Sequence, residues 1–170
     1  MEEEIVNKVA NSALKTFDLE ELYTPGERVV LDIKDQLYRG LVLKEKEFRG
    51  FIKSNDWSAY QGKHVSIQCS VDSIVPTWAF MLLSSVLQPF AATVIFGSLE
   101  QLEITLFKKK LDAMDWSAYK DAKVVIKGCS KVEVPVAVYV EVTNRLRSEV
   151  SSIMFGEPCS TVPIFKKGRS

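Results

Sequence analysis

The sequence lacks the features that assign a chain to several large functional classes. Its 22 basic and 22 acidic side chains cancel, so no net charge draws it toward nucleic acid or an anionic membrane surface. It contains neither G-x-G-x-x-G nor G-x-x-x-x-G-K-[ST], the loops that cradle nucleotide phosphates. Its start, residues 1–4, is acidic where a secretory signal is basic. We therefore expect a cytoplasmic protein that binds neither nucleic acid nor membrane.

Histidine and cysteine are also scarce. The one histidine, His64, begins a predicted strand that ends at Cys69, so the two side chains should stand roughly 16 Å apart. This separation disfavours a Cys–His or Ser–His–Asp catalytic arrangement. The three cysteines, Cys69, Cys129 and Cys159, include no C-x-x-C pair. An odd number without a signal peptide predicts reduced thiols rather than a disulfide framework.

What the sequence does contain is an internal repeat with a period of 59 residues. Residues 56–100 and 115–159 share twelve identities in forty-five ungapped positions, where chance would give about three. The motif Asp-Trp-Ser-Ala-Tyr opens both copies, and Val-Pro and Phe-Gly recur further along. We interpret the Asp-Trp-Ser-Ala-Tyr motifs as structural turns, in which Asp or Ser caps a turn over packed aromatic rings.

The longest apolar stretch, residues 74–96, is long enough to span a bilayer. Gln88 and Pro89 interrupt it, and the equivalent stretch of the second copy carries several charged side chains. A buried helix followed by a buried strand explains both copies, whereas a membrane span explains neither.

Hydrophobic periodicity predicts alternating strands and helices. Strands are expected at residues 29–33, 64–69, 93–96, 123–127 and 152–155, with an edge strand at 162–166, and helices at 3–15, 44–55, 76–87, 99–114 and 135–150. A proline opens two of these helices, at the first helical position. Residues 37–43 also fit a hairpin arm.

This alternation predicts an α/β fold with three layers, in which helices cover both faces of a mostly parallel sheet of about five strands. We expect one domain over residues 1–170. It comprises a helical extension at 1–28, a first βα repeat at 29–100, a second repeat at 101–159 and a tail at 160–170.

All three cysteines lie at or after the carboxyl ends of predicted strands, at the edge where open parallel sheets bind ligands. Thiolates suit zinc, cuprous copper and iron–sulfur clusters, and an oxygen donor can complete a tetrahedral site. Asp72 and Glu157 are the nearest candidates for that donor. The predicted metal ligands are therefore Cys69, Cys129, Cys159, Asp72 and Glu157. The alternative is that the cysteines are small buried hydrophobic residues with no ligand.

Four stretches resemble one bacterial protein family. They are residues 30–35, 56–58, 74–79 and 154–163, of which the last is the most specific. The chain is similar over nearly its whole length to the family catalogued as domain of unknown function 2480. No activity is established for that family, so the resemblance supplies no catalytic residues. It implies a cytoplasmic bacterial protein whose genes often lie near iron–sulfur assembly genes.

Three functions follow from these observations. The first is a protein that binds zinc, iron or an iron–sulfur species at the carboxyl edge, as an accessory to iron–sulfur assembly and a partner of its proteins. The second is a small-molecule enzyme with Cys159 or Cys129 as a thiolate nucleophile. The third is a scaffold without a ligand. The sequence leaves the substrate, the metal and the oligomeric state open.

Overall fold

The computed structural model of the protein describes residues 14–128, 131–157 and 159–168. The contacts divide the chain into two compact units. We call Pro25–Thr105 the inserted unit, because in the sequence it stands between the two segments of the flanking unit, Met1–Thr24 and Leu106–Ser170. Along the described part of the chain, no helix is both long and apolar enough to cross a membrane.

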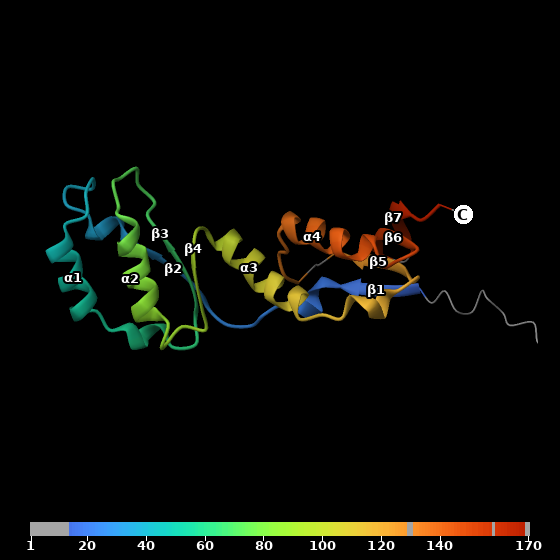
Figure 1. The fold of residues 1–170 in the computed structure, drawn as a ribbon, viewed down its shortest axis with the longest axis horizontal. Coiled ribbons are helices and arrows are strands. Elements are labelled where there is room, and N and C mark those ends of the chain that lie inside the picture. Colours follow the sequence, from blue (N-terminus) through green and yellow to red (C-terminus); the bar gives the residue numbers. More distant parts are fainter. Residues whose placement is uncertain (1–13, 129–130, 158, 169–170) are drawn as a thin grey trace, which may run out of the picture. The chain divides into compact units, whose positions relative to one another are not determined.

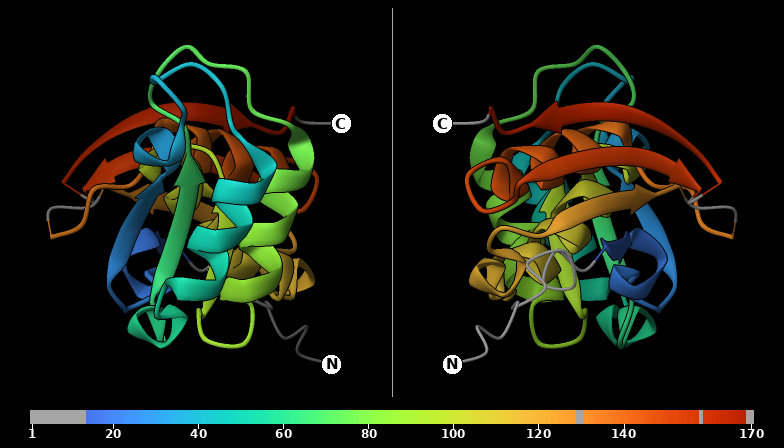
Figure 2. Two further views of the ribbon diagram at one scale, coloured as in Figure 1. Left: turned by 90° about the vertical axis from the view of Figure 1, so that its left-hand side faces the viewer. Right: turned by 90° about the vertical axis from the view of Figure 1, so that its right-hand side faces the viewer.

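The inserted unit is a parallel sheet with two helices on one face (Figure 1). In chain order its elements are β2 (Arg28–Asp32), the 3-10 turn η2 (Ile33–Gln36), α1 (Glu45–Ser54), the 3-10 turn η3 (Trp57–Tyr60), β3 (His64–Gln68), α2 (Thr77–Leu87) and β4 (Thr93–Phe96). The strand order is β2-β3-β4, all parallel, with Val65 beside Val29 and Val94. The left view of Figure 2 shows α1 and α2 side by side against this sheet.

The flanking unit has the same plan with one strand more. Its elements are β1 (Leu14–Asp18), the 3-10 turn η1 (Leu19–Leu22), α3 (Leu99–Asp112), which begins in the inserted unit, the 3-10 turn η4 (Trp116–Tyr119), β5 (Lys123–Lys127), α4 (Val136–Arg147), β6 (Ser152–Glu157) and β7 (Ser160–Lys166). The strand order is β1-β5-β6-β7. The first three strands are parallel and β7 is an antiparallel edge strand, visible in the right view of Figure 2.

The Asp-Trp-Ser-Ala-Tyr turns have the same hydrogen bonds in both units. Asp56 Oδ1 accepts the backbone N–H of Ser58 at 3.0 Å and its hydroxyl at 2.6 Å. Asp115 repeats both bonds with its own serine, at 3.1 and 2.6 Å. The indole N–H of Trp57 donates to the carbonyl of Ile52 in α1 at 2.8 Å, which ties the turn to the helix before it. The interpretation of these motifs as structural turns is confirmed.

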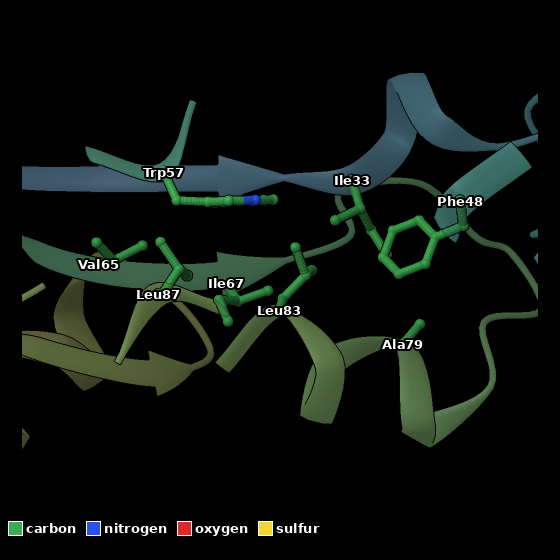
Figure 3. Packing of buried hydrophobic residues seen from close by; sticks show 8 residues of the cluster. All are labelled: Ile33, Phe48, Trp57, Val65, Ile67, Ala79, Leu83 and Leu87. Atoms are coloured by element: carbon green, nitrogen blue, oxygen red, sulfur yellow. The ribbon is translucent and has the colours of Figure 1, made fainter. Parts of the chain in front are cut away.

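The core of the inserted unit lies between its sheet and its two helices. Side chains from β3 point at those from α2, and Trp57 and Phe48 close the cluster (Figure 3). The buried members are Ile33, Phe48, Trp57, Val65, Ile67, Ala79, Leu83 and Leu87. Burying one such leucine stabilises a fold by about 1.5–3 kcal/mol. The flanking unit buries a matching set, Val124, Ile126, Val138, Val142, Leu146 and Ile153.

The α/β class and the parallel pairing predicted from the sequence are confirmed, but the predicted single sheet of about five strands is wrong. The strands form two sheets of three and four strands, so the three-layer arrangement around one sheet is also replaced. Periodicity shows that successive strands are parallel and buried, and it carries no information on whether a new strand extends an old sheet. The prediction of one domain over residues 1–170 stays a prediction.

Several local predictions need correction. The C-terminal end of the helix expected at residues 3–15 is strand, because β1 begins at Leu14, and the rest of that helix falls outside the described residues. Pro76 and Pro135 stand one position before their helices, with extended ψ, instead of at the first helical position. The prediction that residues 37–43 fit a hairpin arm agrees with an antiparallel bridge between Tyr38 and Val42.

Candidate functional site

The carboxyl edge of the flanking sheet gathers charged side chains from three neighbouring strands. Asp18 ends β1, Lys127 ends β5 and Glu157 ends β6. Asp18 and Lys127 are register partners, and their carboxylate and ammonium groups approach to 3.4 Å. Asp18 also caps η1, because its other oxygen accepts the backbone N–H of Glu20 at 2.9 Å. This edge is therefore polar and already organised by hydrogen bonds.

The electrostatics of this edge centre on Lys127. The charge of Asp18 and its hydrogen bond raise the pKa of the Lys127 ammonium, and the charges of Glu157 and Glu20 raise it further against a small opposing effect of burial. Glu20 also accepts the backbone N–H of Lys131 at 3.1 Å, which ties the segment after β5 to η1. One cation thus sits among three carboxylates at the place where parallel sheets bind ligands.

Cys159 lies in the tight turn between β6 and β7. Glu157 and Ser160 pair across the turn, and the Cys159 side chain is exposed. The turn depends on Gly156, whose φ of +124° lies in the left-handed region. A side chain there would place its Cβ 2.5 Å from the carbonyl oxygen of Ser160, so only glycine fits. The exposed thiol therefore lies between two paired strands, two residues after the carboxylate of Glu157.

Cys129 lies outside the described residues, but the strand before it does not. β5 and β6 are hydrogen-bonded parallel neighbours, with Ile126 beside Phe155. This register ends at Ile126 and Phe155, and Gly128, the residue before Cys129, and Glu157 each follow two residues later. The chain segments that lead to Cys129 and Cys159 therefore leave one sheet at adjacent positions.

The carboxyl edge of the inserted sheet carries the other two predicted ligands, Cys69 and Asp72. Cys69 is half-buried, with its sulfur 3.1 Å from the hydroxyl oxygen of Ser73, while Asp72 is exposed. Cys69 and Asp72 thus belong to the inserted unit, and Glu157 and Cys159 to the flanking unit. Within residues 14–128, 131–157 and 159–168, no group of three or more His, Cys, Asp or Glu side chains has the arrangement of a metal site.

Asp32 organises the inserted edge in the way that Asp18 organises the flanking one. Its Oδ1 accepts the backbone N–H groups of Lys34 at 3.0 Å and Ser70 at 3.2 Å. Burial alone would raise the pKa of Asp32, but the hydrogen bonds from Ser70 and Lys34 and the charge of Lys34 outweigh it and lower that pKa. Opposite Asp32 in β3 stands the neutral Gln68, where the flanking unit has Lys127.

The sequence interpretation missed Asp18 as the partner of Lys127, because it assigned residues 1–28 to a helical extension. A signal for them exists. Residues 17–19, Phe-Asp-Leu, repeat the pattern of residues 31–33, Leu-Asp-Ile, fourteen positions earlier. In both triplets the aspartate caps a 3-10 turn, and the following residue, Leu19 or Ile33, is buried.

His64 takes no part in either edge. It is buried at the start of β3, at the opposite end from Cys69, and its Nε2 lies 2.9 Å from the carbonyl oxygen of Pro25. The prediction that His64 is not a catalytic base for Cys69 is confirmed.

A comparison with protein families finds one match. The model described as "Protein of unknown function (DUF2480)" matches residues 3–167, nearly the whole chain. The chain therefore belongs to that family. No curated protein and no solved structure matches it.

Proposed function

We propose that the protein binds a thiophilic metal ion or an iron–sulfur species at the carboxyl edge of the flanking sheet, through Cys129, Cys159 and Glu157. The observation that carries this proposal is the adjacency of β5 and β6. These parallel neighbours lead directly to the two cysteines. Two thiolates and one carboxylate form a donor set that suits zinc or ferrous iron and leaves a fourth position open.

The charges at this edge suit such a complex. Two thiolates and a carboxylate would exceed the charge of a divalent ion by one unit. Lys127 already lies in the field of Glu157, so its ammonium group is placed to offset that excess. Cys159 is exposed, which gives an incoming ion or cluster access to the thiol.

Cys69 and Asp72, also predicted as ligands, belong to the inserted unit and are not part of this proposed donor set. Cys69 has a polar neighbour of its own in Ser73. Its substitution therefore serves as a comparison for the flanking pair. Together with the family resemblance, the thiol edge supports a role as an accessory to iron–sulfur assembly.

Metal uptake by single-cysteine variants tests the proposal. The full-length protein is purified without oxygen, incubated with zinc or ferrous iron, desalted and analysed for bound metal. We expect about one equivalent in the wild type, a loss of at least about tenfold in affinity for Cys129→Ser and Cys159→Ser, and little change for Cys69→Ser. Wild-type protein that takes up neither metal, or uptake lost only in Cys69→Ser, contradicts the proposal.

The exposure of Cys159 also favours a second candidate, an enzyme that uses this thiolate as a nucleophile. Alkylation at neutral pH discriminates between the two. A nucleophilic Cys159 reacts much faster than Cys69, in a protein that takes up no metal. Uniformly slow labelling of all three thiols, together with no metal uptake, leaves the scaffold function.

A further inference from the structure

The edge strand β4 of the inserted unit lacks a neighbour that its counterpart has. In the flanking unit, β6 occupies the equivalent place and pairs on its outer side with β7. In the inserted unit, no strand of the described chain pairs with the outer side of β4. Gly97 donates its N–H to Ile67 of β3, and amide direction alternates along a strand. The backbone polar groups of Val94 and Phe96 therefore point to the unpaired side.

The side chains along this edge form an apolar groove. It measures about 430 Å³ and is lined by Ile67, Thr77, Phe80, Met81, Ser84, Val94, Ile95 and Phe96. A groove of about 470 Å³ in the flanking unit is lined by six of the positions 59 residues further on, and there Ile164 of β7 also contributes to the lining. Phe96 is 66% exposed, whereas its counterpart Phe155, opposite Val162 of β7, is 39% exposed.

Charge is absent from this face. Residues 73–99, which comprise α2, β4 and their flanks, contain no Asp, Glu, Lys, Arg or His. The equivalent helix α4 carries Glu141, Arg145 and Arg147. A neutral face meets no like charge when it contacts a copy of itself, which is the electrostatic requirement of a two-fold interface.

The other edge strands contain charged residues or proline. β1 has Lys15 and Asp18, β7 has Pro163 and Lys166, and β2 has Arg28. Charged side chains and proline are the usual protection of a sheet edge against association. β4, with the sequence Thr-Val-Ile-Phe, has neither.

We propose that β4 pairs antiparallel with β4 of a second copy of this chain, around a two-fold axis at Ile95. The dimer joins the two inserted sheets into one sheet of six strands. A two-fold axis perpendicular to the sheet makes the partner strand antiparallel, which is the direction that β7 takes on β6. Because the axis passes beside Ile95, Val94 and Phe96 exchange backbone hydrogen bonds with Phe96 and Val94 of the second copy.

The composition of β7 supports this occupant. Val162, Pro163 and Phe165 stand opposite Phe155, Met154 and Ile153 of β6, with Ile164 at the bulge. In the proposed register, Val94, Ile95 and Phe96 of the second copy take the equivalent places opposite Phe96, Ile95 and Val94. A second β4 therefore places a valine first and a phenylalanine last along the paired edge. Val162 and Phe165 of β7 take the same places on β6.

Association around a two-fold axis also closes the edge. Each β4 uses its one unpaired side, so the assembly stops at a dimer whose outer edges are the two β2 strands. The exposed Phe96 becomes partly covered, as Phe155 is beside β7, which reduces an apolar surface that would otherwise favour aggregation.

Sedimentation equilibrium of the full-length protein tests the dimer. The wild type should have twice the 19.2 kDa mass of one chain at micromolar concentrations. We expect Phe96→Lys to raise the dissociation constant at least about tenfold, because it places a charge inside the interface. Val140→Lys is the control, since Val140 is an exposed apolar residue of the flanking unit and its substitution should leave the mass unchanged.

Cross-linking tests the register independently of these variants. In the proposed dimer, position 95 faces itself in a pair without mutual hydrogen bonds, with Cα atoms about 4.5 Å apart, a separation that a disulfide spans. Mild oxidation of Ile95→Cys should give a covalent dimer that the wild type does not form. Thermal unfolding checks that each variant is folded. A monomeric wild type overturns the proposal. A dimer that only Val140→Lys weakens, or that Ile95→Cys does not cross-link, overturns it too.

Discussion

Helices α2 and α4 occupy equivalent places in the two units, yet only α4 carries charged side chains. In α4, Glu141 binds Arg145 at 2.7 Å, and Arg145 reaches Asp112 of α3. The hydrogen bond of Arg145 lowers the pKa of Asp112. In α2, the solvent-facing positions hold Met81, Ser84 and Ser85 instead. The inner faces of the two helices are alike, and the outer faces differ.

The same contrast holds for the sheets. The buried positions of β3 and β5 carry Val and Ile in the same register, and both follow the same Asp-capped turn. The carboxyl edges differ, with Gln68 in one unit where the other has Lys127. The lateral edges also differ, because β7 covers only the flanking sheet. The packing is thus common to both units, and their specialisation lies at edges and outer faces.

The largest effect is expected in the core, where the two units should respond alike. Leu87 and Leu146 are equivalent residues 59 positions apart, and both are fully buried. We expect Leu87→Ala and Leu146→Ala each to lower the free energy of unfolding by about 2–5 kcal/mol, because each leaves a cavity. Urea unfolding followed by circular dichroism measures both. Leu41→Ala, at a 62% exposed leucine, is the control. A loss below about 1 kcal/mol in one of the two variants contradicts equivalent cores.

The capped turns offer a second test, with a smaller effect. Asp56→Ala and Asp115→Ala each remove the acceptor for a backbone N–H and a serine hydroxyl. We expect each to cost about 1 kcal/mol in the free energy of unfolding. Asparagine at either position keeps an acceptor oxygen and should restore most of the loss. If only one turn is sensitive, the two motifs are not equivalent anchors.

The smallest effect is expected at the carboxyl edge, where Lys127→Gln gives the flanking unit the residue that the inserted unit has at position 68. Asp18 raises the pKa of Lys127 above its ordinary 10.5, so the folded state favours the ammonium form. The resulting stabilisation is present below that ordinary pKa and disappears as the pH rises through the folded-state pKa. Lys127→Gln should therefore be less stable than the wild type at neutral pH, by less than the loss of a turn cap, since the pair is partly exposed.

The pH dependence of the melting temperature tests whether the ion pair causes the loss of stability in Lys127→Gln. The difference in melting temperature between the wild type and Lys127→Gln should shrink above about pH 10.5. A difference that stays constant through alkaline pH contradicts an ion pair as its source. The reciprocal variant, Gln68→Lys, places an ammonium opposite Asp32 and should gain a similar pH dependence.

Much of the local structure follows from the sequence. The strands around Val65 and Val124 and the helices after Pro76 and Pro135 appear within a few residues of their predicted bounds. Apolar periodicity and turn residues act over a few positions, so they mark such elements well. The strand β1 was missed because it is short and half-polar and follows a stretch with helical periodicity.

The candidate site was predictable only in part. The sequence places Cys129 and Cys159 after strands, and parallel order makes the carboxyl edge their common position. It does not reveal that Cys69 follows a strand of a different sheet, nor that Asp18 lies beside Lys127 across more than a hundred residues of chain. Contacts of that kind depend on which strand becomes whose neighbour.

The sequence by itself determined the α/β class, the repeated turns and the family to which the chain belongs, because these rest on local periodicity and on matching residues along the chain. The tertiary structure alone decided that the repeats build two sheets, that β1 and β2 each join the sheet of a different copy, and that β7 covers one lateral edge while β4 is left without a strand neighbour in the described chain. Strand pairing is made by backbone groups that every residue carries, so side-chain patterns mark the strands but do not name their partners.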